Sequence, residues 1–316
     1  MKNNGWIYQE QVKPGDAGRS LLDYYTQRYP HSSQEEWRSR IEQGQILVND
    51  KPATVETWLQ TGQQLAYHRP PWQEPDVPTH IDILYDDRDV LVVAKPSGLP
   101  VLPGGGFLQH TLLWQLQQRY PNETPFPIHR LGRGTSGLLL LARSPQARAS
   151  LSQQMRQSTL NHSGDRPIQK VYRALIGPCD LPDTFTINQP IGKIAHPALG
   201  HIYGATNTGL PAHSEAQILR RERDRTLLNV TILTGRPHQI RIHLASIGHP
   251  LLGDPLYLPG GQPRTPTPHN GTDTKIPVPG DCGYWLHAHQ ITFHHPRTHQ
   301  PMTLVCPAPP ILRIRG

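Results

Sequence analysis

The sequence has few cysteines, no long apolar run and fewer acidic than basic residues, and each shortage excludes a class of protein. Three cysteines among 316 residues (Cys179, Cys282 and Cys306) form no CxxC pair and no disulfide framework. We therefore expect a reduced, cytosolic protein. Apolar stretches such as Leu138–Ala142 are far too short to span a bilayer. The N-terminal residues lack the apolar core of a signal peptide.

The excess of basic residues favours a polyanionic partner. Lys and Arg number 31 against 24 Asp and Glu, a formal net charge of +7. A basic enzyme with no such partner is the alternative. No GxGxxG follows a predicted strand and no Walker loop is present, so we expect no nucleotide cofactor. The pairs His287/His289 and His294/His295 have no carboxylate or thiolate at ligand spacing, so we expect no metal.

Composition divides the chain into two domains. Residues 1–68 form a small unit, and a Pro-rich linker follows at 69–79, where consecutive prolines favour a stiff, extended spacer. Residues 80–316 form the larger unit. Within it, Pro259–Pro279 is rich in Gly, Pro and Thr and predicts a long surface loop.

The small unit begins with two predicted helices. Apolar residues between 21 and 25 share one face, with Ser20 ahead as a cap, and Ser33-x-x-Glu36 has the form of a capping box. Two short strands are predicted after them, at 44–51, where the first enters a tight turn, and at 61–67.

This order of elements resembles the alpha-L RNA-binding domain of a ribosomal protein and several RNA-modifying enzymes. In that interpretation, Arg38, Arg40 and Lys51 present a basic ridge to phosphates. The alternative is a small interaction domain with ordinary surface charges.

The larger unit intersperses helices and strands without regular alternation. The pattern predicts an α+β fold with a mixed, largely antiparallel sheet, not a doubly wound one. Helices are expected at 108–119 and 146–157, and strands at 81–87, 90–95, 138–142, 171–176, 216–221 and 226–233.

Four polar, basic segments interrupt or adjoin the apolar strands. They read HRLGRGTSG (129–137), KVYRALIG (170–177), LTGRPHQIRIHL running into GHPLLGDPLY (233–257), and LHA followed by HHP (286–296). Arg offers forked donors to phosphate, Gly lets the backbone approach a ligand, and a buried Tyr stacks on a base. Any one segment alone could be a solvated loop, but together they indicate a nucleic-acid or nucleotide pocket.

These segments resemble the RluA-type pseudouridine synthases over residues 80–310. The resemblance implies an isomerase that converts uridine to pseudouridine in ribosomal or transfer RNA, by moving the ribose from N1 to C5 of uracil. It implies RNA as the partner, no cofactor or metal, no membrane and no obligate protein partner.

One position departs from the family pattern. The family motif is HRLDxxTSG with an essential Asp, and here Gly132 stands in its place. Glycine has no side chain to act as nucleophile or base. Three interpretations follow: another carboxylate serves, with Asp254 and Asp165 as candidates; positioning and electrostatics suffice; or the scaffold binds RNA without catalysis.

The resemblance also assigns roles to individual residues. Tyr172 corresponds to the active-site Tyr that stacks on the base, and Arg241 to the basic partner of the missing Asp; we expect both to be catalytic. With that Asp absent, Arg241 is expected to face solvent or RNA. The residues expected to bind substrate are His129, Arg130, Arg133, Thr135, Arg236 and His238.

Two rival functions belong to other classes. One is an RNA-binding protein with a catalytically inactive synthase fold, and the other is an enzyme acting on free nucleosides.

Overall fold

The computed structural model describes residues 2–160, 166–196, 199–264 and 277–314. The chain divides into two compact units, Met1–Glu74 with His196–Gly200 and Pro75–Ala195 with His201–Gly316. The predicted linker at 69–79 stays a prediction. The expected loop Pro259–Pro279 lies partly outside the described residues, as does the candidate carboxylate Asp165.

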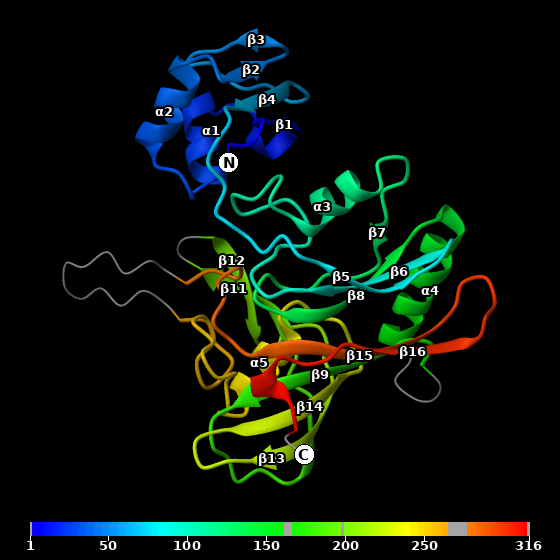
Figure 1. Ribbon diagram of the computed structural model, residues 1–316. Coiled ribbons are helices and arrows are strands. Elements are labelled where there is room, and N and C mark those ends of the chain that lie inside the picture. Colours follow the sequence, from blue (N-terminus) through cyan, green and yellow to red (C-terminus); the bar gives the residue numbers. More distant parts are fainter. Residues whose placement is uncertain (1, 161–165, 197–198, 265–276, 315–316) are drawn as a thin grey trace. The chain divides into compact units, whose positions relative to one another are not determined.

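The small unit packs two helices against a four-stranded antiparallel sheet (Figure 1). Both predicted helix starts are confirmed: Ser20 accepts a hydrogen bond from the amide of Asp23, and Ser33 and Glu36 form a reciprocal capping box. Trp37 is buried at the centre of the core, between the helices and the sheet. The elements are β1 (Trp6–Gln11), η1 (Pro14–Asp16), α1 (Leu21–Arg28), α2 (Gln34–Glu42), β2 (Ile46–Val48), β3 (Lys51–Pro52) and β4 (Gln64–Arg69).

The large unit is built on a ten-stranded sheet in the order β10-β13-β14-β9-β15-β8-β6-β5, with β16 paired to β15 and β7 paired to β8. Its strands are β5 (Asp82–Asp86), β6 (Val90–Lys95), β7 (Phe126–Pro127), β8 (Ser136–Ala142), β9 (Gln169–Ile176), β10 (Thr184–Ile187), β13 (Ser214–Arg221), β14 (Thr226–Ile232), β15 (Leu286–His294) and β16 (Pro301–Val305). Strands β11 (Ile191–His196) and β12 (Gly200–Ala205) form a separate two-stranded sheet.

This sheet confirms the predicted α+β class. The strand pairs in it are antiparallel except that of β8 with β15. The apolar runs of β6 and β8 are almost wholly buried because both of their faces are covered. The helices are α3 (Leu112–Arg119), α4 (Pro145–Leu160), α5 (Gln239–Ser246) and the short η2 (Pro310–Leu312).

Helix α3 begins four residues later than predicted. Thr111 provides the N-cap by accepting a hydrogen bond from the amide of Trp114, so the helix starts at Leu112 instead of residue 108. The predicted helix at 146–157 corresponds to α4 and is confirmed.

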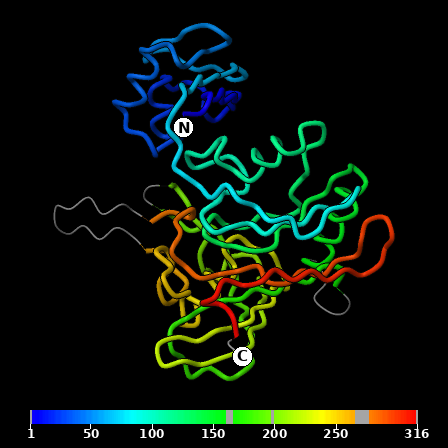
Figure 2. Tube along the Cα trace, in the orientation of Figure 1, coloured from blue at the N-terminus to red at the C-terminus, as the bar shows by residue number. Residues whose placement is uncertain are grey.

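The parallel contact between β8 and β15 joins two motifs that are far apart in sequence (Figure 2). Gly137 pairs with Ala288 there, at φ +105°. A Cβ on Gly137 would lie 2.2 Å from the carbonyl oxygen of Ala288. Only glycine permits this approach, which places the start of β8 beside the start of β15.

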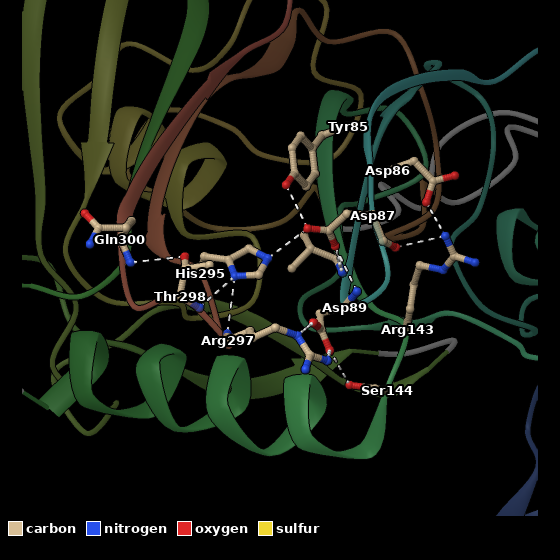
Figure 3. Close-up of polar contacts among 11 residues, drawn as sticks. Tyr85, Asp86, Asp87, Asp89, Arg143, Ser144, His295, Arg297, Thr298 and Gln300 are labelled. Carbon is tan, nitrogen blue, oxygen red and sulfur yellow. Dashed lines mark hydrogen bonds and ion pairs between the residues drawn. The ribbon is translucent and has the colours of Figure 1, made fainter.

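A polar network fastens the turn after β15 to the turn after β5 (Figure 3). His295 donates through Nε2 to Asp87 at 2.9 Å, and the Tyr85 hydroxyl donates to the same carboxylate at 2.8 Å. Arg297 forms two hydrogen bonds with Asp89. The His295 Nδ1 accepts from the amide of Arg297, which assigns the ring proton to Nε2. These hydrogen bonds hold the two turns together, which is a structural role.

In the part of the chain that is described, no helix is long and apolar enough to cross a membrane. The same residues contain no group of three or more His, Cys, Asp or Glu side chains arranged to hold a metal ion.

Candidate active site

The four motifs converge on one cavity of about 460 Å³ in the large unit. This volume lies within the ordinary range for small-ligand sites. The loop before β8, strand β9, the start of α5 and the segment before β15 all contribute to its wall. Seven of the eight predicted site residues line it: His129, Arg130, Thr135, Tyr172, Arg236, His238 and Arg241.

Side chains of Lys95 and Ser97 donate hydrogen bonds to the backbone of the loop that carries the HRLGRGTSG motif. Lys95, 1% exposed, donates through Nζ to three carbonyl oxygens, including that of Arg133 at 3.2 Å. Ser97 donates to the carbonyl of Gly134 at 2.8 Å. These contacts fix the backbone of the loop, so its side chains project from a rigid base.

Arg133 is the predicted site residue that lies outside the cavity wall. Its Nε donates to the carbonyl of Gly280 at 2.6 Å, and its guanidinium lies 5.3 Å from the ring centroid of Phe107. The side chain therefore braces the loop.

Helix α5 begins at the cavity with His238 as its N-cap, in the left-handed conformation at φ 55°. The Tyr257 hydroxyl donates to the carbonyl of Tyr203 at 2.7 Å, so the His238 Nδ1, 2.7 Å from that hydroxyl, is the donor to it. This leaves the lone pair on Nε2. Burial lowers the pKa of His238 to about 3, so the ring is neutral at physiological pH.

His129 has a structural contact of its own. Its Nε2 accepts a hydrogen bond from the amide of Leu140 at 3.2 Å, and burial lowers its pKa to about 3. The neutral ring lines the cavity and also ties the loop to β8.

The expectation that Arg241 faces solvent or RNA is wrong. Arg241 is 2% exposed and forms two hydrogen bonds of 2.7 Å with Asp254. Its guanidinium carbon also lies 5.0 Å from the ring centroid of Tyr257 and 4.2 Å from that of Tyr284. The physical reason is that Asp254, thirteen residues on, supplies the countercharge that makes burial possible.

Asp254 itself does not line the cavity. Its Oδ1 accepts from the amides of Leu256 and Tyr257 as well as from Arg241. Its four hydrogen bonds leave no free carboxylate for chemistry. Among the described residues that line the cavity, none is acidic.

Besides the Nε2 of His238, three polar side chains of the cavity wall have few or no hydrogen bonds of their own. Arg130 is exposed, and within the described ranges its guanidinium has no ion pair or hydrogen bond. The hydroxyl of Tyr172, a 7% exposed residue of β9, likewise has no hydrogen-bond partner among the described residues. Among the described residues, the Lys170 ammonium has a side-chain hydrogen-bond contact with the Met155 sulfur alone, at 3.5 Å, and burial lowers its pKa to about 8.

Two polar residues of the wall that sequence reasoning missed bear on the chemistry, Lys170 and Tyr284. Lys170 could have been found, because it stands two residues before Tyr172 and so faces the same side of a strand. Tyr284 precedes β15 in irregular chain, and no periodic signal marks it.

Comparison with known proteins identifies the class to which this fold and cavity belong. A family model described as RNA pseudouridylate synthase matches residues 89–246. The chain is 51% identical over 292 residues to an RNA pseudouridine synthase of Synechocystis sp., named there as uncharacterized, covering 92% of this chain and 95% of that one. It is 39% identical to RNA pseudouridine synthase 5 of Arabidopsis thaliana, covering 99% of this chain and 95% of that one.

The name of a third relative refers to the large ribosomal subunit. Ribosomal large subunit pseudouridine synthase D of Xylella fastidiosa is 32% identical over 318 residues, covering 96% of this chain and 90% of that one. Among solved structures, Human RNA Pseudouridylate Synthase Domain Containing 1 matches with a TM-score of 0.55 and 24% identity, covering 76% of this chain and 89% of that one. That likeness shows the fold.

The chain belongs to the RNA pseudouridine synthase family, whose members are isomerases that act on RNA.

Proposed function

We propose that this protein converts uridine to pseudouridine in structured RNA, with large-subunit ribosomal RNA as the first candidate and transfer RNA as the second. The order follows from the relatives named for the ribosomal large subunit. The observation that carries the proposal is the gathering of Tyr172, Arg130 and Arg241 around one cavity that is large enough for a nucleotide. A flipped uracil stacked on Tyr172 would place its ribose phosphates near Arg130.

Helix α4 offers a path for the RNA backbone next to this cavity. Met155 and Thr159 of α4 line the candidate active-site cavity, and Arg148 and Arg156 of the same helix line a second cavity of about 650 Å³. The Arg148 guanidinium stacks 3.6 Å from the ring centroid of Phe126 in β7. Neither arginine has an ion-pair partner among the described residues, so both are free to contact phosphates.

The small unit would add phosphate contacts in the manner of an alpha-L domain. Arg38 and Lys51 are exposed, which suits that role. Arg40 suits it less, because it stacks 4.4 Å over Trp37 and donates to Ser32 at 2.8 Å.

The test uses the full chain and RNA labelled with tritium at C5 of uridine. Forming the C5–C1′ bond releases that hydrogen, so tritium release measures isomerisation directly. We expect release from ribosomal RNA, mapped to discrete positions, and none from free uridine or uridine monophosphate. RNA binding should weaken steeply with salt. Release from free nucleosides, with residues 1–75 dispensable, would favour a nucleoside enzyme instead.

A second candidate function is favoured by one specific observation. No acidic side chain is among the described residues of the cavity wall, which suits an RNA-binding protein without catalysis. Salt-sensitive RNA binding with no tritium release from any RNA would establish that alternative.

A further inference from the structure

Among the described residues of the cavity wall there is no carboxylate, but a second tyrosine lies where the family motif would place one. Tyr284 is 4% exposed and lines the cavity, with its side chain against the motif loop. A Cβ added at Gly132 would lie 3.0 Å from the Tyr284 hydroxyl oxygen. The hydroxyl therefore occupies the space into which a side chain at 132 would project.

The loop is shaped to admit this ring. A Cβ at Gly134 would lie 2.9 Å from two ring carbons of Tyr284, closer than real contacts allow. Both glycines of the segment Gly132-Arg133-Gly134 thus leave room for one aromatic side chain. The structure gives this as a local reason for glycine at both positions.

Tyr284 is held in a single orientation. The Arg241 guanidinium lies 4.2 Å from its ring centroid, and Arg241 is itself fixed by two hydrogen bonds to Asp254. The hydroxyl lies 3.2 Å from the Thr135 oxygen. A donor fixed before substrate binds is the arrangement that stabilises developing charge most effectively.

The ionisation state of Tyr284 suits a donor and not a nucleophile. Burial raises its pKa, although the charge of Arg241 lowers it in part. The hydroxyl therefore keeps its proton at neutral pH.

Building on the proposed function, we propose that the Tyr284 hydroxyl is the hydrogen-bond donor that stabilises the departing uracil ring. When the C1′–N1 bond breaks, its electron pair leaves with the ring, and negative charge spreads to the ring oxygens. The ring turns, and its C5 supplies the pair for the new C1′–C5 bond. C5 then loses a proton to water and N1 takes one from water, so the composition of the nucleotide is unchanged. Tyr284 donates a hydrogen bond throughout and forms no covalent bond.

The first test is Tyr284→Phe in single-turnover tritium release with protein in excess over RNA. We expect the rate to fall about a hundredfold, the effect of removing one such donor, with RNA affinity changed less than about twofold. Tyr85→Phe is the matched control. It also removes one tyrosine hydroxyl from the large unit, the one bonded to Asp87, and should keep the wild-type rate.

A second measurement separates a chemical role from a structural one. Replacing Tyr284 by a difluorotyrosine, which is more acidic, should move the alkaline limb of the rate profile to lower pH, because ionisation removes the donor. Packing alone would not produce that shift.

The outcomes are distinguishable. Wild-type protein that releases no tritium overturns the proposed function and this inference with it. An active wild type whose Tyr284→Phe variant is equally active overturns this inference alone. This inference alone is also overturned if the Tyr284→Phe variant loses RNA affinity as much as it loses rate. It is likewise overturned if the fluorinated enzyme has the same rate–pH profile as the wild type.

Discussion

Replacing Asp254 by Ala tests the buried ion pair that supports the site. The substitution leaves the Arg241 guanidinium at 2% exposure without its countercharge and removes two hydrogen bonds of 2.7 Å. It also leaves the amides of Leu256 and Tyr257 without their side-chain acceptor. Breaking a buried pair from one side costs about 3–5 kcal/mol. The 3.3 Å bond from Arg241 to the Pro279 carbonyl remains, so we expect the lower end, about 3 kcal/mol.

The measurement is urea unfolding followed by circular dichroism, compared with Asp183→Ala. Asp183 also pairs with an arginine, Arg221, but its side chain is 81% exposed. Such a pair contributes less than about 1 kcal/mol. If the two variants lose equal stability, the assignment of Asp254 as the structural countercharge of Arg241 is wrong.

Three further changes probe the RNA surface, the cavity charge and the backbone. Arg148→Ala with Arg156→Ala should raise the Kd for RNA and reduce the salt slope by about 1 to 2, measured by filter binding; an unchanged slope removes α4 from the footprint. Because the Lys170 ammonium loses its proton above its pKa of about 8, RNA affinity should fall between pH 7 and pH 9, and Lys170→Met should flatten that dependence. Gly137→Ala should destabilise the fold by roughly 2–5 kcal/mol in thermal unfolding, since its Cβ would meet the Ala288 carbonyl; a loss under about 1 kcal/mol contradicts the close approach.

Features set by neighbouring residues in the chain were predictable from the sequence. The capping box of Ser33 and Glu36 is complete within four residues, so its recognition needs no tertiary information. The runs of β6 and β8 were equally clear, because burial of both faces makes them continuously apolar. The start of α3 was misplaced because the sequence pattern does not single out Thr111 as the N-cap, and helix ends are uncertain by a few residues.

Individual side-chain contacts between residues distant in the chain were not predictable. The motifs predicted a common pocket, but not which charge would neutralise Arg241. That choice depends on the turn that brings Asp254 back against α5. Tyr284 was missed for the same reason, because its significance rests on contact with glycines about 150 positions earlier.

The charge balance of the cavity follows from these two unpredicted contacts. In a site where an arginine neutralises a catalytic carboxylate, the two charges cancel within the cavity. Here Asp254 neutralises Arg241 from outside the cavity wall, and Arg130, Lys170 and Arg236 remain as cations that line it. An anion that enters the cavity would lower the electrostatic repulsion among them. We therefore expect the cavity to favour a phosphate-bearing nucleotide over a neutral base. Under our proposal, the chemistry on the base depends on neutral donors such as the two tyrosine hydroxyls.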